Sequence, residues 1–174
     1  MKRSQRRQMQ EAIKEIPFAV FCLDTEKNDE ASKLAETMKA PFFTSPESME
    51  KTALYVVYDQ EGTCLTDGEM TLRGDYIPRI RRLQHHNLTH EALIKAAHSK
   101  DKKELLTAID GTAGLGEDSL LLAAYGFSVT LCEHNPVIAA LLKDTLARAR
   151  IIPELEPVVS RMTVYEGSSL TCFA

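Results

Sequence analysis

Strand-like and helix-like segments alternate through the second half of this 174-residue chain, and this alternation predicts an α/β fold with a parallel sheet. Two further observations support this fold class. A glycine-rich loop joins one strand-like run directly to a helical stretch, and the apolar positions of residues 136–150 form one stripe, as in a helix that covers a sheet. We therefore expect right-handed strand-helix-strand units and a parallel sheet that helices cover on both faces.

The first half, residues 1–86, predicts a small β-containing α+β domain. Its two strand-like runs and the helix between them are expected at residues 18–23, 54–58 and 28–40. Asn28 or Asp29 is expected to cap that helix. Turn signals at Gly62 and Gly68 surround a brief apolar-polar alternation, which predicts a hairpin or a small meander.

The second half, residues 87–174, contains the regular alternation. Its expected helices are residues 87–98, 117–125 and 136–150, and its expected strands are residues 105–110, 128–133 and 161–167. Pro136 directly follows Asn135, which is a helix-start signal because proline fits the first turn of a helix and asparagine caps it.

Residues 109–118, IDGTAGLGED, predict a cradle for a ligand between a strand and a helix. Glycines at positions 111, 114 and 116 allow positive φ angles and let a ligand approach the backbone, and the following helix offers free amides. Glu133 ends the next strand, so its carboxylate is expected beside this loop, where it can accept hydrogen bonds from both hydroxyls of a ribose. The alternatives are that the glycines form only a tight turn and that Glu133 is only a solvated residue at the end of a strand.

The spacing of the glycines narrows the choice of ligand. The loop reads G-x-x-G-x-G after Asp110, whereas a dinucleotide site requires G-x-G-x-x-G and a P-loop requires Gly-Lys-Ser/Thr. Asp110 would also repel a phosphate group at the strand tip. These features favour a cationic nucleoside such as S-adenosylmethionine (SAM), and they disfavour a nicotinamide-dependent oxidoreductase.

Composition and charge argue against several other classes of protein. No apolar run reaches the length of a membrane span, about 18 residues, and the N-terminus lacks the apolar core of a secretory signal. We therefore expect a cytoplasmic protein that does not associate with a membrane. The four cysteines are scattered without metal-binding spacing, which predicts free thiols and no metal. The net charge of −4 argues against a uniformly basic coat but leaves two basic clusters, one near Lys2 and one at residues 79–90.

Two stretches closely resemble the bacterial RsmJ family: DGTAGLGEDSLLLAAYGFSVTLCEHNPVIAALLKDTLARA, which starts at Asp110, and YEGSSL, which ends at Leu170. Members of this family are class I methyltransferases that modify a guanine of small-subunit (16S) ribosomal RNA at its exocyclic N2. The resemblance implies a SAM-dependent rRNA (guanine-N2) methyltransferase with a Rossmann-like sheet, present here in part. It implies an N-terminal domain at 1–86 that ends in the basic segment, followed by a SAM-binding domain at 87–174.

The candidate cofactor residues come from the sequence of the glycine loop and from the family resemblance. The loop itself supplies Asp110, Gly111, Gly114 and Gly116. The resemblance adds Glu117, Asp118, Glu133, His134, Ser168 and Ser169. It implies that Glu133 holds the ribose, that Asp118 caps the helix or reaches the methionine end, and that the two serines bond the adenine side. The family usually has arginine at positions 117 and 134, so Glu117 reverses a charge beside the cofactor.

The expected RNA contacts are Arg79, Arg81 and Arg82, because binding ribosomal RNA or the small ribosomal subunit requires neutralised phosphates. A solvated helix start is the alternative for this segment. The family's Asp-Pro-Met-Phe-Pro-like motif does not occur in the sequence, so no catalytic residue is assigned, and His134 is expected to face the adenosine. The chain therefore resembles a truncated member of the family. The alternative function is a non-catalytic cofactor- or RNA-binding fragment or paralogue.

Overall fold

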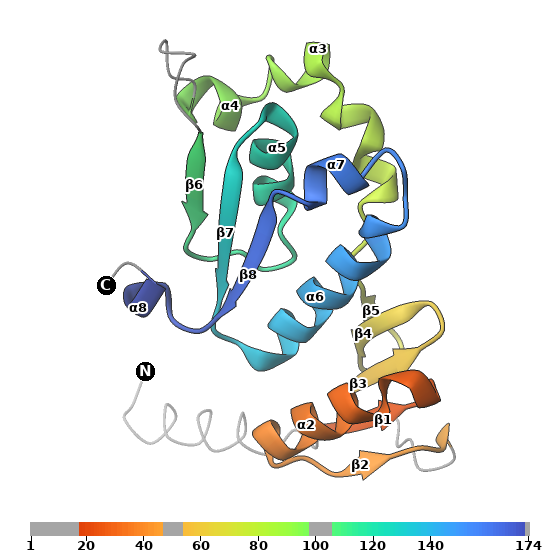
Figure 1. Ribbon diagram of the computed structural model, residues 1–174. Coiled ribbons are helices and arrows are strands. Elements are labelled where there is room, and N and C mark those ends of the chain that lie inside the picture. Colours follow the sequence, from red (N-terminus) through yellow and green to blue (C-terminus); the bar gives the residue numbers. More distant parts are fainter. Residues whose placement is uncertain (1–17, 47–53, 98–105, 173–174) are drawn as a thin grey trace, which may run out of the picture. The chain divides into compact units, whose positions relative to one another are not determined.

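The computed structural model describes residues 18–46, 54–97 and 106–172 (Figure 1). The basic cluster near Lys2 lies outside these residues. The chain divides into two compact units, Met1–Leu72 and Arg73–Ala174, and each is described by itself. Residues 73–86 belong to the second unit, and the domain boundary expected after residue 86 stays a prediction. None of the described helices is long and apolar enough to cross a membrane.

The first unit contains a five-stranded sheet and a helix that packs on it. The strands are β1 (Phe18–Cys22), β2 (Phe42–Phe43), β3 (Leu54–Asp59), β4 (Gly62–Thr66) and β5 (Thr71–Leu72), in the order β2-β1-β3-β4-β5. β1 pairs in parallel with β2 and β3, whereas β4 pairs antiparallel with β3 and β5. The predicted strands and the predicted meander of this half are therefore confirmed.

The helix predicted between these strands is confirmed as α2 (Asn28–Met38), but its predicted cap is wrong. Neither Asn28 nor Asp29 caps this helix, and the cap position has no side-chain hydrogen bond. A 3-10 turn, η2 (Thr25–Lys27), runs directly into α2, and Asp24 caps that turn by accepting a backbone amide hydrogen bond of 3.1 Å. The polar cap therefore lies one turn earlier than the helical pattern indicates.

The second unit contains a three-stranded parallel sheet in the order β6-β7-β8 (Figure 1). Its strands are β6 (Thr107–Asp110), β7 (Ser128–Glu133) and β8 (Met162–Glu166), and its helices are η4 (Ile77–Leu83), α3 (His85–Leu88), α4 (Ala92–Ala97), α5 (Glu117–Tyr125), α6 (Pro136–Arg150), α7 (Glu156–Val159) and α8 (Ser169–Cys172). The predicted helices α5 and α6 and the three predicted parallel strands are confirmed. Asn135 caps α6 as expected, since its side chain accepts from the Val137 amide at 3.0 Å.

Helices α5 and α6 pack on the same face of the parallel sheet. Leu131 of β7 points to this face and forms one buried cluster with Leu120 of α5 and Leu142 of α6. On the opposite face, Ile109 and Tyr165 remain 46% and 37% exposed. In the described part of the chain, α5 and α6 cover one face, and the expected helical cover of the other face is limited to the short helix α8, which contacts β7. The strands follow one another in chain order, so each right-handed crossover returns on the same side of the sheet.

A break divides the helix predicted at residues 87–98 into α3 and α4. The Thr89 hydroxyl donates to the carbonyl of His86 at 3.1 Å, and the amides of His90 and Glu91 bond to carbonyls three residues earlier. This tight turn ends α3. Threonine competes locally for backbone groups, which the spacing of apolar residues does not reveal. The 3-10 helix η4, which runs through the start of the basic segment, is likewise not predicted from the sequence.

Candidate functional site

The three parallel strands end in acidic residues at one edge of the sheet. Asp110 ends β6, Glu133 ends β7 and Glu166 ends β8. Glu133 and Glu166 are register partners, and Asp110 is the register partner of Leu131. The glycine loop follows β6 at this edge, and α8 follows β8 there (Figure 1). Ligands of open α/β sheets bind outside the carboxyl ends of the strands, so this edge is the candidate site.

Glu133 joins the glycine loop to the start of α6. Its Oε2 accepts from the Gly114 amide at 3.1 Å, and its Oε1 accepts from the Asn135 amide at 2.8 Å. Glu133 is only 9% exposed. Each carboxylate oxygen has two acceptor positions, so Glu133 can hold the loop and still accept hydrogen bonds from a ligand. By contrast, the side chain of His134 is 83% exposed, with its Nδ1 3.7 Å from Oε1 of Glu133.

Asp110 connects the end of β6 to helix α5. Its Oδ1 accepts from the Thr112 amide at 3.1 Å, and its Oδ2 accepts from the Ser119 hydroxyl at 2.8 Å. Ser119 is fully buried in α5. These two bonds fix the conformation of the loop at its start, and they keep a negative charge at the tip of the strand.

The three glycines of the loop meet different structural requirements. Gly116 has a φ of +76°, and a Cβ atom there would lie 2.6 Å from the Tyr76 hydroxyl. Gly114 has a φ of +55°, but a Cβ atom there would meet nothing within 4 Å. A Cβ atom at Gly111 would make an ordinary 3.4 Å contact with Ser169. Packing therefore requires Gly116, whereas Gly114 borders the open space in which a ligand can approach the backbone.

Tyr76 supports the glycine loop from outside the predicted motif. Its hydroxyl donates to the carbonyl of Leu115 at 2.7 Å, and the residue is 2% exposed. Burial, together with the negative charge of Glu117, raises the pKa of Tyr76, so the hydroxyl stays protonated and remains a donor. Sequence reasoning missed this residue, because a single tyrosine before a basic segment forms no recognisable pattern.

Helix α5 begins at the glycine loop with the exposed residues Glu117 and Asp118. Gly116 occupies the cap position, and no side chain caps the helix, so the first amides of α5 face the site without a side-chain partner. Nη2 of Arg79 donates to both carboxylate oxygens of Glu117 at 2.8 Å. The negative charge at position 117 is therefore balanced by a cation of η4.

Helix α8 brings one of the two predicted serines to the loop. The Ser169 hydroxyl lies 3.5 Å from the point that a Cβ atom at position 111 would occupy. Ser168 is exposed, and its hydroxyl accepts from the Leu170 amide at 3.3 Å. Ser169 is thus the serine that borders the start of the glycine loop.

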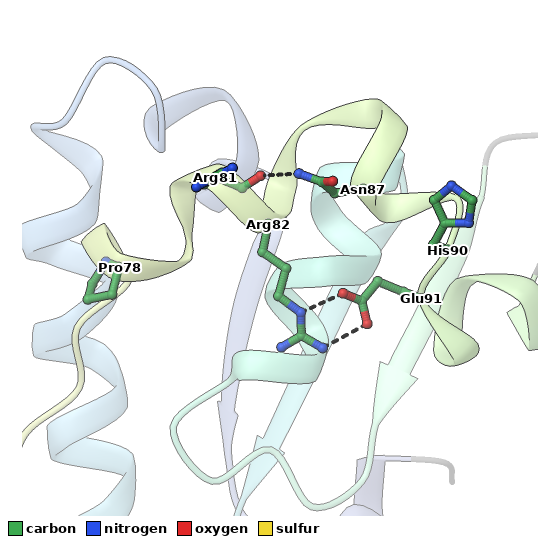
Figure 2. Close-up of a pocket in the computed structure, with 6 residues that line it drawn as sticks. All are labelled: Pro78, Arg81, Arg82, Asn87, His90 and Glu91. Atoms are coloured by element: carbon green, nitrogen blue, oxygen red, sulfur yellow. Dashed lines mark hydrogen bonds and ion pairs between the residues drawn. The ribbon is translucent and has the colours of Figure 1, made fainter.

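The basic segment, residues 79–90, holds its arginines in different surroundings. Arg82 donates to both carboxylate oxygens of Glu91 at 2.6 and 2.7 Å (Figure 2), and this ion pair lowers the pKa of Glu91. Arg81 is exposed, and its carbonyl accepts from the side chain of Asn87 at 2.7 Å. A shallow pocket of about 500 Å³ is lined by Pro78, Arg81, Arg82, Asn87, His90 and Glu91. Glu91 therefore offsets much of the positive charge that Arg82 brings to this pocket.

The edge of the sheet suits a particular kind of ligand. Carboxylates at the strand ends and in the first turn of α5 attract positively charged groups and repel phosphate. Glu133 offers acceptor positions to hydroxyl groups, and the amides of α5 offer donors to a single carboxylate. Within residues 18–46, 54–97 and 106–172, no group of three or more His, Cys, Asp and Glu side chains could hold a metal ion.

Proteins similar to this chain carry the names of methyltransferases. Residues 69–174 match the model of the family described as "Putative SAM-dependent methyltransferase". The chain is 35% identical over 165 residues to ribosomal RNA small subunit methyltransferase J of Alkalilimnicola ehrlichii, a match that covers 91% of this chain and 60% of that protein. It is 39% identical over 89 residues to the protein of the same name of Marinobacter nauticus, over 51% of this chain and 32% of that protein.

A solved structure shares the fold. The crystal structure of a SAM-dependent methyltransferase from Neisseria gonorrhoeae matches with a TM-score of 0.64 and 24% identity, over 88% of this chain and 61% of that chain. The chain spans less than two thirds of the length of the curated relatives named above.

We expect Gly116→Ala to lower the free energy of unfolding by more than Gly114→Ala does. Both variants place alanine at a positive φ, which costs about 1 to 2 kcal/mol. Only the Cβ atom at position 116 would overlap the Tyr76 hydroxyl, which adds about 1 to 3 kcal/mol. Chemical denaturation followed by circular dichroism gives the difference.

Tyr76→Phe provides the control for this comparison. In the Gly116→Ala background it removes the overlapping hydroxyl and should recover part of the lost stability. Equal destabilisation by the two glycine variants would contradict the packing described for Gly116.

Proposed function

The chain belongs to the SAM-dependent methyltransferase family, and we propose that it binds SAM at the carboxyl ends of β6 and β7 and serves the methylation of a guanine N2 in small-subunit (16S) ribosomal RNA. The observation that carries the proposal is the Glu133 carboxylate, held by the Gly114 and Asn135 amides beside an open glycine loop. The printed name of the curated relatives supports RNA as the substrate.

In this proposal, Glu133 accepts hydrogen bonds from the ribose of the cofactor. The two oxygens keep unused acceptor positions, and the open space at Gly114 lets the nucleoside approach. Ser169, which borders Gly111, is proposed to bond the adenine side. The full set of proposed cofactor contacts is Asp110, Gly111, Gly114, Gly116, Glu117, Asp118, Glu133, His134, Ser168 and Ser169.

The charge of the site favours SAM over a dinucleotide. SAM carries a sulfonium and an ammonium group, which carboxylates at the strand ends and at Asp118 attract. Its single carboxylate can meet the first amides of α5, since helix N-termini bind anions. Asp110 would oppose the two phosphates of a dinucleotide at the same place.

When bound, SAM supplies an activated methyl group. The residues of the chain have to place the guanine amine in line with the methyl carbon and exclude water. An exocyclic amine is a weak nucleophile, so a group near it has to accept its proton as charge develops. We assign this role to none of the described residues, and His134, which is almost fully exposed, is proposed only as a rim contact of the cofactor.

For the RNA, we propose phosphate contacts along the basic segment, residues 79–90, which overlaps the end of the proposed domain of residues 1–86. Arg81 is the leading candidate because it is exposed beside the shallow pocket. Arg79 and Arg82 are also proposed contacts, but each donates to a carboxylate, so an RNA phosphate has to compete with Glu117 and Glu91. We also propose a cytoplasmic location, because the proposed substrate is ribosomal RNA.

A methyl-transfer assay tests the proposed reaction. The protein is incubated with labelled SAM and small-subunit ribosomal RNA that lacks the modification, and the RNA is digested and examined for N2-methylguanine. Label in N2-methylguanine supports the proposal. Cofactor binding without transfer would overturn its enzymatic part in favour of the alternative, a non-catalytic cofactor- or RNA-binding fragment or paralogue.

Glu133→Gln is expected to weaken the binding of S-adenosylhomocysteine about tenfold or more, because it replaces an acceptor oxygen by an amide donor and removes the charge. Isothermal titration calorimetry measures the change. Glu166→Gln is the matched control, since Glu166 is the register partner of Glu133 but is exposed and paired with Lys143 at 2.7 Å. The same affinity for Glu133→Gln and the wild type would contradict the ribose contact.

Arg81→Ala is expected to weaken binding of a small-subunit ribosomal RNA fragment. It should also reduce the slope of log affinity against log salt by about 0.7 to 0.9, the contribution of one phosphate contact. Filter binding at several salt concentrations gives this slope. Arg150→Ala, which removes an exposed arginine from the end of α6, is the control and should leave the slope unchanged. An identical slope for Arg81→Ala and the wild type would exclude Arg81 as a contact.

A further inference from the structure

Two thiols, those of Cys132 and Cys172, lie together beside the candidate site but outside the proposed cofactor contacts. Cys132 lies near the end of β7 and is 1% exposed. Cys172 ends α8 and is half-buried. Both are free thiols, helix α8 contacts strand β7, and Cys172 lies near enough to raise the pKa of Cys132.

Contacts that do not involve the two thiols hold α8 in this place. Cys132 and Tyr165 are register partners on β7 and β8, so their side chains share the sheet face opposite α5 and α6. The hydroxyls of Tyr165 and Thr171 form a hydrogen bond of 3.0 Å. Thr171 directly precedes Cys172, so this bond holds the end of α8 over the same face beside Cys132. The register of the sheet and this bond therefore bring α8 to the face on which the Cys132 side chain lies.

We propose that Cys132 and Cys172 are an oxidation site, where a low-molecular-weight disulfide converts the two thiols into a reversible intrachain disulfide that locks α8 onto β7. The bond would also fix Ser169, in the first turn of α8, next to Gly111 at the start of the glycine loop. This inference goes beyond the proposed function and does not depend on SAM or RNA binding.

The reaction is an ordinary thiol-disulfide exchange. The Cys172 thiolate attacks the oxidant RSSR and releases one RS⁻, which leaves a mixed disulfide on Cys172. The Cys132 thiolate then attacks the Cys172 sulfur and releases the second RS⁻. The two protein thiols lose two protons and two electrons in total, and RSSR is reduced to two RSH.

The surroundings of the two thiols set the order of these steps. Cys172 is half-buried and meets the oxidant first, whereas Cys132 is almost fully buried. Burial, with further contributions from Cys172 and Asp110, raises the pKa of Cys132 to about 11, so its thiolate is scarce at neutral pH. Attack by Cys132 is therefore expected to be the slower step.

Oxidation of the full chain with oxidised glutathione, followed by alkylation and peptide mass mapping, tests the proposal. We expect a monomer whose mass is lower by two hydrogen atoms, a cross-linked pair of peptides that contain Cys132 and Cys172, and complete reversal by dithiothreitol. A stable glutathione adduct on Cys172 with Cys132 still reduced would overturn the proposal. A disulfide between two chains would also overturn it.

Two variants make the result specific. The double variant Cys22→Ser/Cys64→Ser removes the two buried thiols of the first unit and should form the same bond. Cys172→Ser changes a half-buried position on a short helix and should form no intrachain disulfide at Cys132. Formation of an intrachain bond to Cys132 in the Cys172→Ser variant would contradict the assignment of the pair.

Discussion

The carboxylate of Glu133 is the interaction on which the candidate site depends. It accepts one hydrogen bond from the glycine loop and one from the Asn135 amide, so a single side chain connects β7, the loop after β6 and the start of α6. Hydrogen bonds to a charged group contribute about 1.5 to 3 kcal/mol each. A nearly buried carboxylate also needs these donors, because a buried charge without hydrogen bonds is strongly unfavourable. The Glu133 carboxylate therefore holds the conformation of the loop, and the loop amide satisfies one of its oxygens.

The loop is held on its other side by packing. Tyr76 bonds to the carbonyl of Leu115 and occupies the space that a side chain at Gly116 would need. Asp110 fixes the start of the loop to α5 through Ser119. These contacts leave Gly114 next to open space. The carboxylates of Asp110 and Glu133 and the first amides of α5 belong to the same edge of the sheet. This combination suits a nucleoside with positive charges and a single carboxylate, which is the chemistry of SAM.

The sequence predicts the elements whose signals are local. Strands β6 and β7, helices α5 and α6 and the Asn135 cap follow from apolar spacing and from capping residues within a few positions of each other. The break at Thr89 was missed because a side chain there competes for a backbone carbonyl. Tyr76 and the Arg79–Glu117 ion pair join η4 to a loop far along the chain, and no local pattern reports such a contact. The packing of α5 and α6 on the same face of the sheet depends on strand order, which the spacing of apolar residues does not reveal.

The chain belongs to the SAM-dependent methyltransferase family, and the geometry gives a physical reason for its cofactor. A calorimetric titration of the unmodified protein with S-adenosylhomocysteine and, separately, with NAD tests this reason most directly. The account predicts that S-adenosylhomocysteine binds at one site per chain and that NAD binds far more weakly. Preferential binding of NAD, or no binding of S-adenosylhomocysteine by the folded protein, would contradict it.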